Sequence, residues 1–567
     1  MKRKKFLSRI AAAILAASVL FTGCQGTSQA ESSSVTVSST SQESAAQVPQ
    51  KLEELRIGAV KEHMSFNMIN NSTNVGGILA MVNYTGFVMA QLVQKDETGT
   101  VQPAFMRSWT ISEDGKSLTF KIPTDAKFHD GVPVTAEDVE FTFNFYKEKM
   151  KKNNLSNMES IEILEPDTLR VTFSTPSAYS FLNDLNTMTT YVVPKHVWEN
   201  IENPKEYEGE DSRIGCGPFK FVSYDEAAQT SYYEAVDDYF GGEVSIKKVS
   251  LHSYATHEAL AMALINGEID VVYNYAMSLD PSLAGLLEKS ENIDLGLGAN
   301  PGNEYVTFGL DRLPACRDLQ FRKACSYAID YSTMAKAIGG DYGEVAGRGV
   351  FAPGNRGFDA SIEKLEFNVE MANSILDEAG YKDVDGDGFR ENPDGSELDI
   401  MITPYATQAT APLRSRQIEI IADGFKQAGL KTHADEECLS NFDLGYQKVF
   451  NTHDYDLLIG GVTQGIASYN TASAYFAKTD NGMGYGTFDD PDYVDTYLSL
   501  FTLTTDTEYL ESVAKLQKMN AELIPGIALC WQTSLFPYRT DTFSGGVYYP
   551  GWGMVNNKTW FTMTAKA

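Results

Sequence analysis

The chain has 567 residues, of which 43% are hydrophobic and 22% charged, and its formal net charge is −30. Because about 100 to 200 residues make a domain, this length predicts about three or four domains around a large core. The acidic balance excludes a protein whose main task is to bind nucleic acid phosphates, and the evenly spread apolar residues exclude global disorder and fibrous repeats.

The first 23 residues have the pattern of a secretory signal peptide. Five cations lie within the first nine residues, and the apolar stretch Ile10 to Phe21 is shorter than the roughly 20 residues that span a membrane. Thr22-Gly23-Cys24 resembles the lipobox of bacterial lipoproteins, which implies a lipid on Cys24. Residues 24–50 are rich in Ser, Thr and Gln and predict a flexible tether.

This leader predicts an extracytoplasmic protein that is lipid-anchored to the outer face of the bacterial cell membrane, or periplasmic in a Gram-negative cell. The alternative is an ordinary secretory signal in which Cys24 is incidental. Export is expected in both cases.

Five further cysteines follow Cys24, an odd number that cannot pair completely within the chain. Cys316 and Cys325 are close enough in sequence for a disulfide in an oxidising compartment. Free buried thiols are the favoured interpretation, because a core of this size needs no covalent cross-link.

The predicted elements begin with a strand at residues 52–60. Alternating apolar residues at 109–111 and 118–122 flank the turn 112–115 and predict a β-hairpin. Pro133 to Asp138 then supplies an N-cap hydroxyl with a carboxylate three residues later, which predicts a helix starting near Ala136.

Further along, strands and helices alternate. Residues 169–173 favour a strand, and the order strand 249–251, helix 259–266 and strand 268–272 is typical of an α/β unit. Apolar spacing predicts a helix at 321–329, and Gly339-Gly340 ends the next one. The fold class is therefore mixed α/β.

Four segments resemble, in order, motifs of the family 5 solute-binding proteins, the receptors of ABC importers for peptides, nickel complexes and some sugars. They are Trp109–Phe145, Gly215–Phe219, Ala263–Asp270 and Arg322–Asp330. The resemblance implies a type II periplasmic-binding-protein-like fold of two lobes with an extra inserted domain, and ligand enclosed as the lobes hinge shut.

The resemblance also implies a domain plan. After the signal peptide and the tether, domain I is expected in three separate segments, with domains II and III inserted between them. The ranges are 51–84, 206–300 and 526–567 for domain I, 85–205 for domain II and 301–525 for domain III.

The cargo site is expected in the loop that follows Tyr455-Asp456-Leu457. Peptide receptors of the family place an Asp there to meet the α-amino group of the ligand, whereas this chain has Gly465 near that position. A buried ammonium without a counter-charge costs several kcal/mol. Either another acid supplies the anchor or the cargo lacks the amine.

Five side chains are candidates for ligand contact. The loop residues could instead only turn the chain, and an aromatic residue at either remaining position could belong to the core. The candidates are Gln464, Ser468 and Tyr469 in the loop, and Tyr305 and Trp531 by family position.

Residues 383–394 have the order of ligands found in an EF-hand calcium loop. Acids stand at positions one, three, five, nine and twelve, with Gly at position six. The expected structural Ca²⁺ ligands are Asp383, Asp385, Asp387, Phe389, Glu391 and Asp394. The alternative is an Asp/Gly-rich turn without an ion, and a strand rather than a second helix is expected after the loop.

No HExxH, GxSxG, GxxxxGK[ST] or Rossmann glycine motif is present, so the chain is expected not to be an enzyme and to require no cofactor. The resemblance implies a monomer that captures a small solute, a peptide or peptide-like molecule, and delivers it to ABC permease subunits with separate ATPase subunits. The alternatives are the same receptor binding an oligosaccharide or a chelated metal and, more remotely, a secreted hydrolase or adhesin.

Overall fold

The structure is a computed structural model in which the chain divides into two units, Met1–Val48 and Pro49–Ala567. The described residues all lie in the second unit. They are 50–566 without 62, 64, 72–76, 84, 153–154, 186–189, 274–277, 408–409, 463–471, 480–483 and 550–551. The predicted signal peptide, Cys24 and nearly all of the tether lie outside them. Among the described residues, no helix is both long enough and apolar enough to cross a membrane.

A seven-stranded mixed sheet forms the base of the second unit. Its central strand β1 pairs in parallel with β10 and with β11, and helix α7 connects these two neighbours. The other strands are antiparallel additions. In sheet order they are β12 Ile293–Asp294, β18 Tyr538–Arg539, β11 Val271–Val272, β1 Leu52–Ala59, β10 Ile246–Ser253, β9 Thr230–Ala235 and β8 Phe219–Asp225, with α7 at His257–Asn266.

A four-stranded antiparallel sheet lies beside this base, and helix α4 packs on it. One hydrophobic cluster contains buried side chains from both sheets, so the two sheets share a core. We call them, with their helices, the first body. The bounds are β4 Ser108–Ile111, β5 Ser117–Lys121, β7 Thr168–Phe173, β6 Met158–Glu165, α4 Ala136–Glu148 and α5 Ala178–Asp184.

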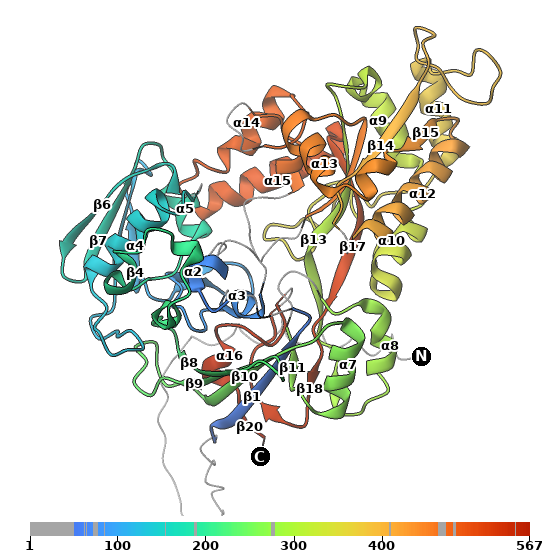
Figure 1. Cartoon of the computed structure of the whole chain (residues 1–567). Helices are drawn as coiled ribbons and strands as arrows, with labels where there is room; N and C mark the ends of the chain where they lie inside the picture. Colours follow the sequence, from blue (N-terminus) through green and yellow to red (C-terminus); the bar gives the residue numbers. More distant parts are fainter. Residues whose placement is uncertain are drawn as a thin grey trace, which may run out of the picture. The chain divides into compact units, whose positions relative to one another are not determined.

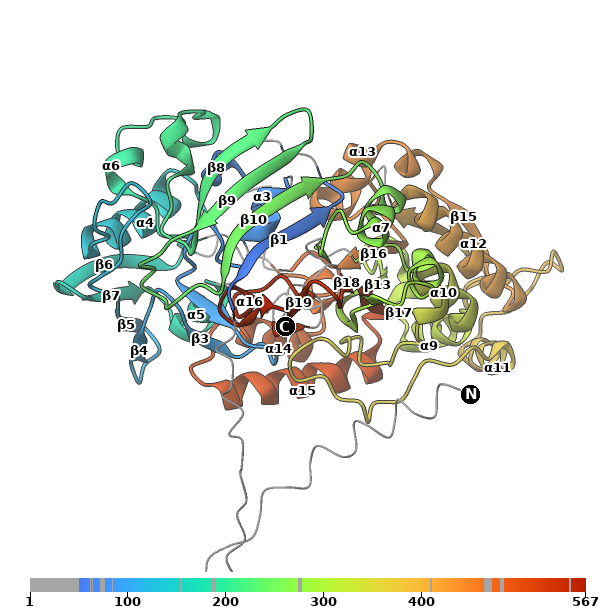
Figure 2. The ribbon, with the colours of Figure 1, turned by 90° about the horizontal axis from the view of Figure 1, so that it is seen from below.

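A five-stranded sheet with its own hydrophobic cluster forms the second body. The strands, in sheet order, are β15 Lys431–Ala434, β14 Asp399–Pro404, β16 Leu457–Val462, β13 Leu297–Phe308 and β17 Gly526–Leu535. The helices are α9 Leu319–Tyr327, α10 Tyr331–Gly339, α11 Val369–Ala379, α12 Ala411–Gln427, α13 Phe442–Tyr446, α14 Pro491–Ser499 and α15 Asp506–Leu523. In both views the four-stranded sheet lies at the opposite end from α11 (Figures 1 and 2).

Short elements complete the first body. They are α2 Met68–Asn71, α3 Ile78–Asn83, β2 Val93–Lys95, β3 Val101–Pro103, α6 Lys195–Trp198, α8 Ala284–Leu287, β19 Phe543–Ser544, α16 Thr559–Thr562 and β20 Thr564–Ala565.

Strands β13 and β17 connect the two bodies as an antiparallel ribbon (Figure 1). β13 follows β12 of the seven-stranded sheet, and β17 leads into β18 of the same sheet. The pairing of the ribbon shifts register between Ala299 and Asn303. Such an irregularity breaks the regular ladder and marks a position where a strand bends.

The elements with strong local signals are confirmed. The hairpin is β4–β5, and α4 begins at Ala136 behind the predicted capping box of Thr135 and Asp138. Helix α7 ends at Gly267, whose φ of +76° suits a residue without a Cβ. The free cysteines are also confirmed, since all five after Cys24 are buried and unpaired. The domain boundaries stay a prediction.

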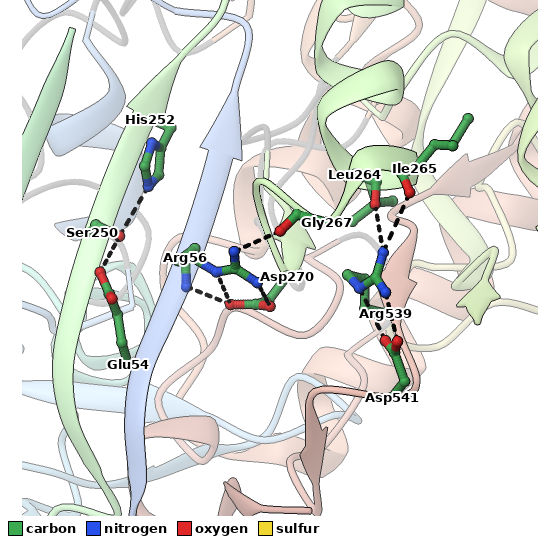
Figure 3. Close-up of polar contacts among 10 residues, drawn as sticks. All are labelled: Glu54, Arg56, Ser250, His252, Leu264, Ile265, Gly267, Asp270, Arg539 and Asp541. Carbon is green, nitrogen blue, oxygen red and sulfur yellow. Dashed lines mark hydrogen bonds and ion pairs between the residues drawn. The ribbon is translucent and has the colours of Figure 1, made fainter. Parts of the chain in front are cut away.

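Two arginines satisfy the backbone carbonyls at the end of α7 (Figure 3). Arg56 donates to the carbonyl of Gly267 at 2.6 Å and to both carboxylate oxygens of Asp270, and Arg539 donates to Leu264 and Ile265. Because the last carbonyls of a helix have no partner within it, these cations join α7 to its neighbours. The segment Ala263–Asp270 thus has a structural role.

Candidate functional site

The candidate site lies where the parallel strands of the second body end. β14 and β16 are parallel neighbours, and in open α/β sheets ligands bind beyond the carboxyl ends of such strands. Residues 463–471, which follow β16, lie outside the described residues. The ligand contacts expected of Gln464, Ser468 and Tyr469 therefore stay predictions. So does the expectation that the uncharged Gly465 takes the place of the anchoring acid.

The end of β16 packs closely against two side chains of β13. A Cβ on Gly460 would lie 2.6 Å from the hydroxyl oxygen of Tyr305, and one on Gly461 would lie 2.6 Å from a carboxylate oxygen of Glu304. Real Cβ atoms essentially never approach a neighbour that closely, so Gly460-Gly461 allows β16 to run directly over these side chains of β13.

A buried ion pair lies beneath this end of the strand. Glu304 of β13 pairs with Arg414 of α12, and their side chains are 13% and 4% exposed. Arg414 also donates to the carbonyl of Tyr405 at 2.9 Å and to Gln417 at 2.7 Å. Glu304 is therefore an acid opposite the end of β16, and its charge is balanced by Arg414.

Six aromatic rings form a continuous cluster beside the ion pair. Neighbouring ring centroids are 4.9 to 6.3 Å apart, in the tilted or edge-on arrangements that aromatic pairs prefer. Two rings face solvent, since Tyr446 is 48% and Tyr485 is 38% exposed. We call this set the six-ring cluster: Tyr305, Tyr405, Tyr446, Phe450, Tyr475 and Tyr485.

Of this cluster, only Tyr305 is predicted from the sequence. The signal for two others is local, because Tyr446 and Phe450 are four residues apart and so lie on one helical face. The remaining rings come from separate segments, and only the fold brings them together.

Tyr305 and Trp531 both lie inside the second body. Tyr305 is fully buried, and burial raises the pKa of its hydroxyl well above 10. Trp531 is 7% exposed and packs edge-on against Phe358 at 5.1 Å. Neither the Tyr305 hydroxyl nor the Trp531 indole nitrogen has a hydrogen-bond partner among the described residues. Buried polar atoms are seldom left unpaired, so both remain candidate contacts.

The first body carries a second aromatic group where its own parallel strands end. His63 lies shortly after β1, with its ring 4.8 Å from that of Tyr224, and Phe66 lies 5.2 Å from Tyr224. Burial lowers the pKa of His63, which favours a neutral imidazole. The guanidinium of Arg213 lies over the rings of Phe66 and Phe221. Aromatic side chains therefore mark the carboxyl-end edges of both sheets.

The predicted calcium loop brings its first three acids together. Ligand atoms of Asp383, Asp385 and Asp387 lie within 4.8 Å of one another, and all three residues are exposed. Glu391 accepts a hydrogen bond from the backbone of Val384, and Asp394 accepts two from Ser396. Helix α11 precedes the loop and, as expected, strand β14 follows it. Calcium binding stays a prediction, with Phe389 expected to offer its carbonyl.

A cavity of about 490 Å³ lies at the opposite edge of the first sheet, where β1 and β10 begin. Lys51, Lys127, Lys220 and Lys247 at this cavity each pair with an acidic side chain. Of the predicted contact residues, the two that the structure describes, Tyr305 and Trp531, do not line it.

Two α/β bodies that share a sheet ribbon, each with an aromatic group at the carboxyl ends of its strands, define the class of two-lobed binding proteins. Residues 100–484 match the bacterial extracellular solute-binding proteins, family 5. The chain belongs to this family.

Curated relatives and solved structures agree with this assignment. The chain is 25% identical over 446 residues to the oligopeptide-binding protein AppA of Bacillus subtilis, covering 76% of each chain. It is 26% identical over 363 residues to heme-binding protein A of Haemophilus influenzae, covering 59% of this chain and 61% of the relative.

The fold is shown by solved structures of low sequence identity. AppA of B. subtilis in complex with a nonapeptide is matched with a TM-score of 0.66 at 21% identity, over 92% of this chain and 100% of that one. HbpA2 of Haemophilus parasuis gives a TM-score of 0.75 at 19% identity, over 91% and 100%. The predicted two-lobed α/β fold is therefore confirmed.

Proposed function

We propose that this chain is the substrate-binding lipoprotein of an ABC importer, which captures a peptide or peptide-like solute between its two bodies and delivers it to a permease powered by separate ATPase subunits. The observation that carries the proposal is the two-body fold of a solute-binding family. The similarity to AppA, an oligopeptide-binding protein, supports a peptide as the cargo.

The six-ring cluster is the proposed contact surface for the cargo. Tyr446 and Tyr485 offer exposed ring faces, and Glu304 carries no uncompensated charge for an ammonium group. We therefore expect a cargo whose affinity comes from stacking and apolar contact more than from a salt bridge to its amino terminus.

Mass spectrometry of the natively purified chain would identify the bound solute directly. Peptides of two to nine residues, chito-oligosaccharides and nickel–histidine would then be titrated, with tryptophan fluorescence as the signal. We expect Tyr446→Ala and Tyr485→Ala each to weaken peptide binding about tenfold, which is about 1.4 kcal/mol. Tyr232→Ala, a similarly exposed tyrosine on β9, is the matched control.

Two results would count against the peptide proposal. Saturable binding of an oligosaccharide or a metal chelate without any peptide binding would favour the second candidate function, which the exposed rings support because sugars stack on aromatic faces. Catalytic conversion of any solute by the purified chain would show that the protein is an enzyme and would contradict the proposed receptor function.

We further infer that Cys24 carries the lipid anchor and that the receptor acts as a monomer. Cys24→Ser is expected to release the protein from the membrane fraction of the producing cell into the soluble fraction. An unchanged membrane fraction would show that the anchor lies elsewhere.

A further inference from the structure

One buried side chain of the first body belongs to the core of the second, and the half-buried Ile111 of β4 packs against the same core. All other buried members of the second hydrophobic cluster lie between Tyr305 and Trp531, but the cluster also contains Tyr179 of helix α5. Tyr179 is 8% exposed. Helix α5, which carries this tyrosine, follows the four-stranded sheet and lies away from the β13–β17 ribbon (Figure 1).

The inserted tyrosine ends in a charged hydrogen-bond network. Its hydroxyl donates to a carboxylate oxygen of Asp506 at 2.7 Å, and the other oxygen of Asp506 pairs with Arg356. Arg356 lies over the ring of Tyr509, with 5.3 Å from its guanidinium carbon to the ring centre. Hydrogen bonds to an ionised group are stronger than neutral ones, and the one from Tyr179 joins residues 327 positions apart.

Two neighbouring contacts widen the junction. Ser180 donates to the carbonyl of Phe501 at 2.9 Å. Gly115, at the tip of the β4–β5 hairpin, lies so close to Thr504 that an added Cβ would come within 2.7 Å of its methyl group. The hairpin tip and α5 thus both contact the segment that leads into α15.

The second body presents Asp506 in a fixed position. Asp506 is the first residue of α15, and the helix start is fixed by a capping box between Thr505 and Glu508. A carboxylate at this end of a helix is stabilised by the helix dipole. Burial raises the pKa of Tyr179 to about 12, with the hydrogen bond to Asp506 adding to the effect, so the hydroxyl remains a donor at physiological pH.

We propose that Tyr179, Asp506 and Arg356 form a latch that holds the two bodies together on the side away from the β13–β17 hinge. Tyr179 is then a positioning residue: it holds the two bodies close to each other and so slows release of the cargo, without contacting the cargo itself. The effect on cargo rests on the proposed function, whereas the effect on the distance between the bodies does not.

The first measurement is the distance between the bodies. Spin labels would be placed on Glu162→Cys of β6 and Lys426→Cys of α12, two exposed positions, in residues 24–567 carrying Cys24→Ser. The five native thiols are buried and should not take up label. We expect Tyr179→Phe to lengthen or broaden the distance distribution of the solute-free protein.

The matched control is Tyr207→Phe, which removes a 2.6 Å hydrogen bond from a tyrosine hydroxyl to Asp211 within the first body. Both variants lose a hydrogen bond to a carboxylate, and only Tyr179→Phe loses contacts across the two bodies, with Asp506 and with Arg356. Asp506→Asn is a second latch variant that changes the other body.

The second measurement is the dissociation rate of a bound solute by stopped-flow fluorescence. Tyr179→Phe and Asp506→Asn should each raise this rate about tenfold, the change expected for loss of one hydrogen bond to a charged group, while Tyr207→Phe leaves it unchanged. Distances and dissociation rates of the latch variants equal to those of Tyr207→Phe would overturn the latch. If no solute binds at all, the proposed function fails while the distance measurement still decides the latch.

Discussion

Asp270 shows what a family motif does at the scale of one residue. It is almost fully buried, with its carboxylate held by the guanidinium and the backbone amide of Arg56 (Figure 3). The sequence alone identified the motif as a mark of the family, but the partner Arg56 lies 214 residues away. A local pattern cannot show such a pairing, because it depends on β1 and β11 being neighbours.

We expect Asp270→Asn to lower the free energy of unfolding by about 2 kcal/mol, because the buried Asp270 carboxylate accepts three hydrogen bonds from Arg56 and hydrogen bonds to charged groups are worth about 1.5 to 3 kcal/mol. Asp541→Asn is the control, since Asp541 is 35% exposed where it pairs with Arg539, and it should cost under about 1 kcal/mol. Urea unfolding followed by tryptophan fluorescence measures both. Equal effects of the two substitutions would contradict the structural role of Asp270.

A half-buried histidine of the first body, His129, gives the stability a dependence on pH. Burial lowers the pKa of His129 from 6.5 to about 4, and its ring lies 3.0 Å from the carbonyl oxygen of Gly217. The unfolded chain takes up a proton below pH 6.5, whereas the folded chain does so only near pH 4. The contribution of His129 is therefore fully present above pH 6.5 and is lost as the pH falls towards 4.

His129→Asn should accordingly flatten the loss of stability between pH 6.5 and pH 4. The wild-type chain should lose roughly 3 kcal/mol more than the variant over this interval, since each pKa unit corresponds to about 1.4 kcal/mol. Urea unfolding at several pH values provides the comparison. Parallel pH profiles for the two proteins would show that His129 titrates alike in both states.

Helix boundaries that depend on interactions within a few residues are predicted correctly from local sequence patterns. The capping box of α4 and the glycine that ends α7 were correct because each acts within a few residues. Five of the six rings of the cluster and the contact of Tyr179 with Asp506 are not predicted, since most of these side chains come from segments far apart in the chain. Buried tyrosines also have no sequence signal that separates core from contact surface.

Binding of Ca²⁺ to the loop at residues 383–394 can be tested by its effect on stability. A weak extracellular-type site with a Kd of about 10⁻⁴ to 10⁻³ M would add about 2 kcal/mol of stability in roughly 10 mM Ca²⁺. After chelation, added Ca²⁺ should therefore raise the Tm of the wild-type chain and not that of Asp385→Asn. Asp423→Asn, an exposed acid on α12, should respond like the wild type. If added Ca²⁺ does not change the Tm of the wild-type chain, the loop is a turn that binds no metal.

At the scale of the whole molecule, two hydrophobic cores joined by one ribbon explain how an acidic chain of this size stays folded and can still change shape. Each body buries a large apolar cluster of its own. The ribbon, the latch and a hydrogen bond from the Tyr342 hydroxyl to Glu288 cross between them. Opening would then break the polar contacts of the latch and withdraw the ring of Tyr179 from the second core, while the sheets and helices of each body stay packed, as a hinge motion between rigid bodies requires.

Large cores also make disulfides unnecessary in an exported protein. Burial raises the pKa of all five thiols after Cys24, to about 12 for Cys216, Cys438 and Cys530, so each is a poor nucleophile.

We expect residues 24–567 carrying Cys24→Ser to show no reaction with a thiol reagent at pH 8 when native, and five reactive thiols after unfolding without reductant. Three thiols would instead reveal a disulfide, with Cys316 and Cys325 as the first pair to test. A Tm that reductant leaves unchanged would support the same conclusion independently, because the cores alone would then hold the fold.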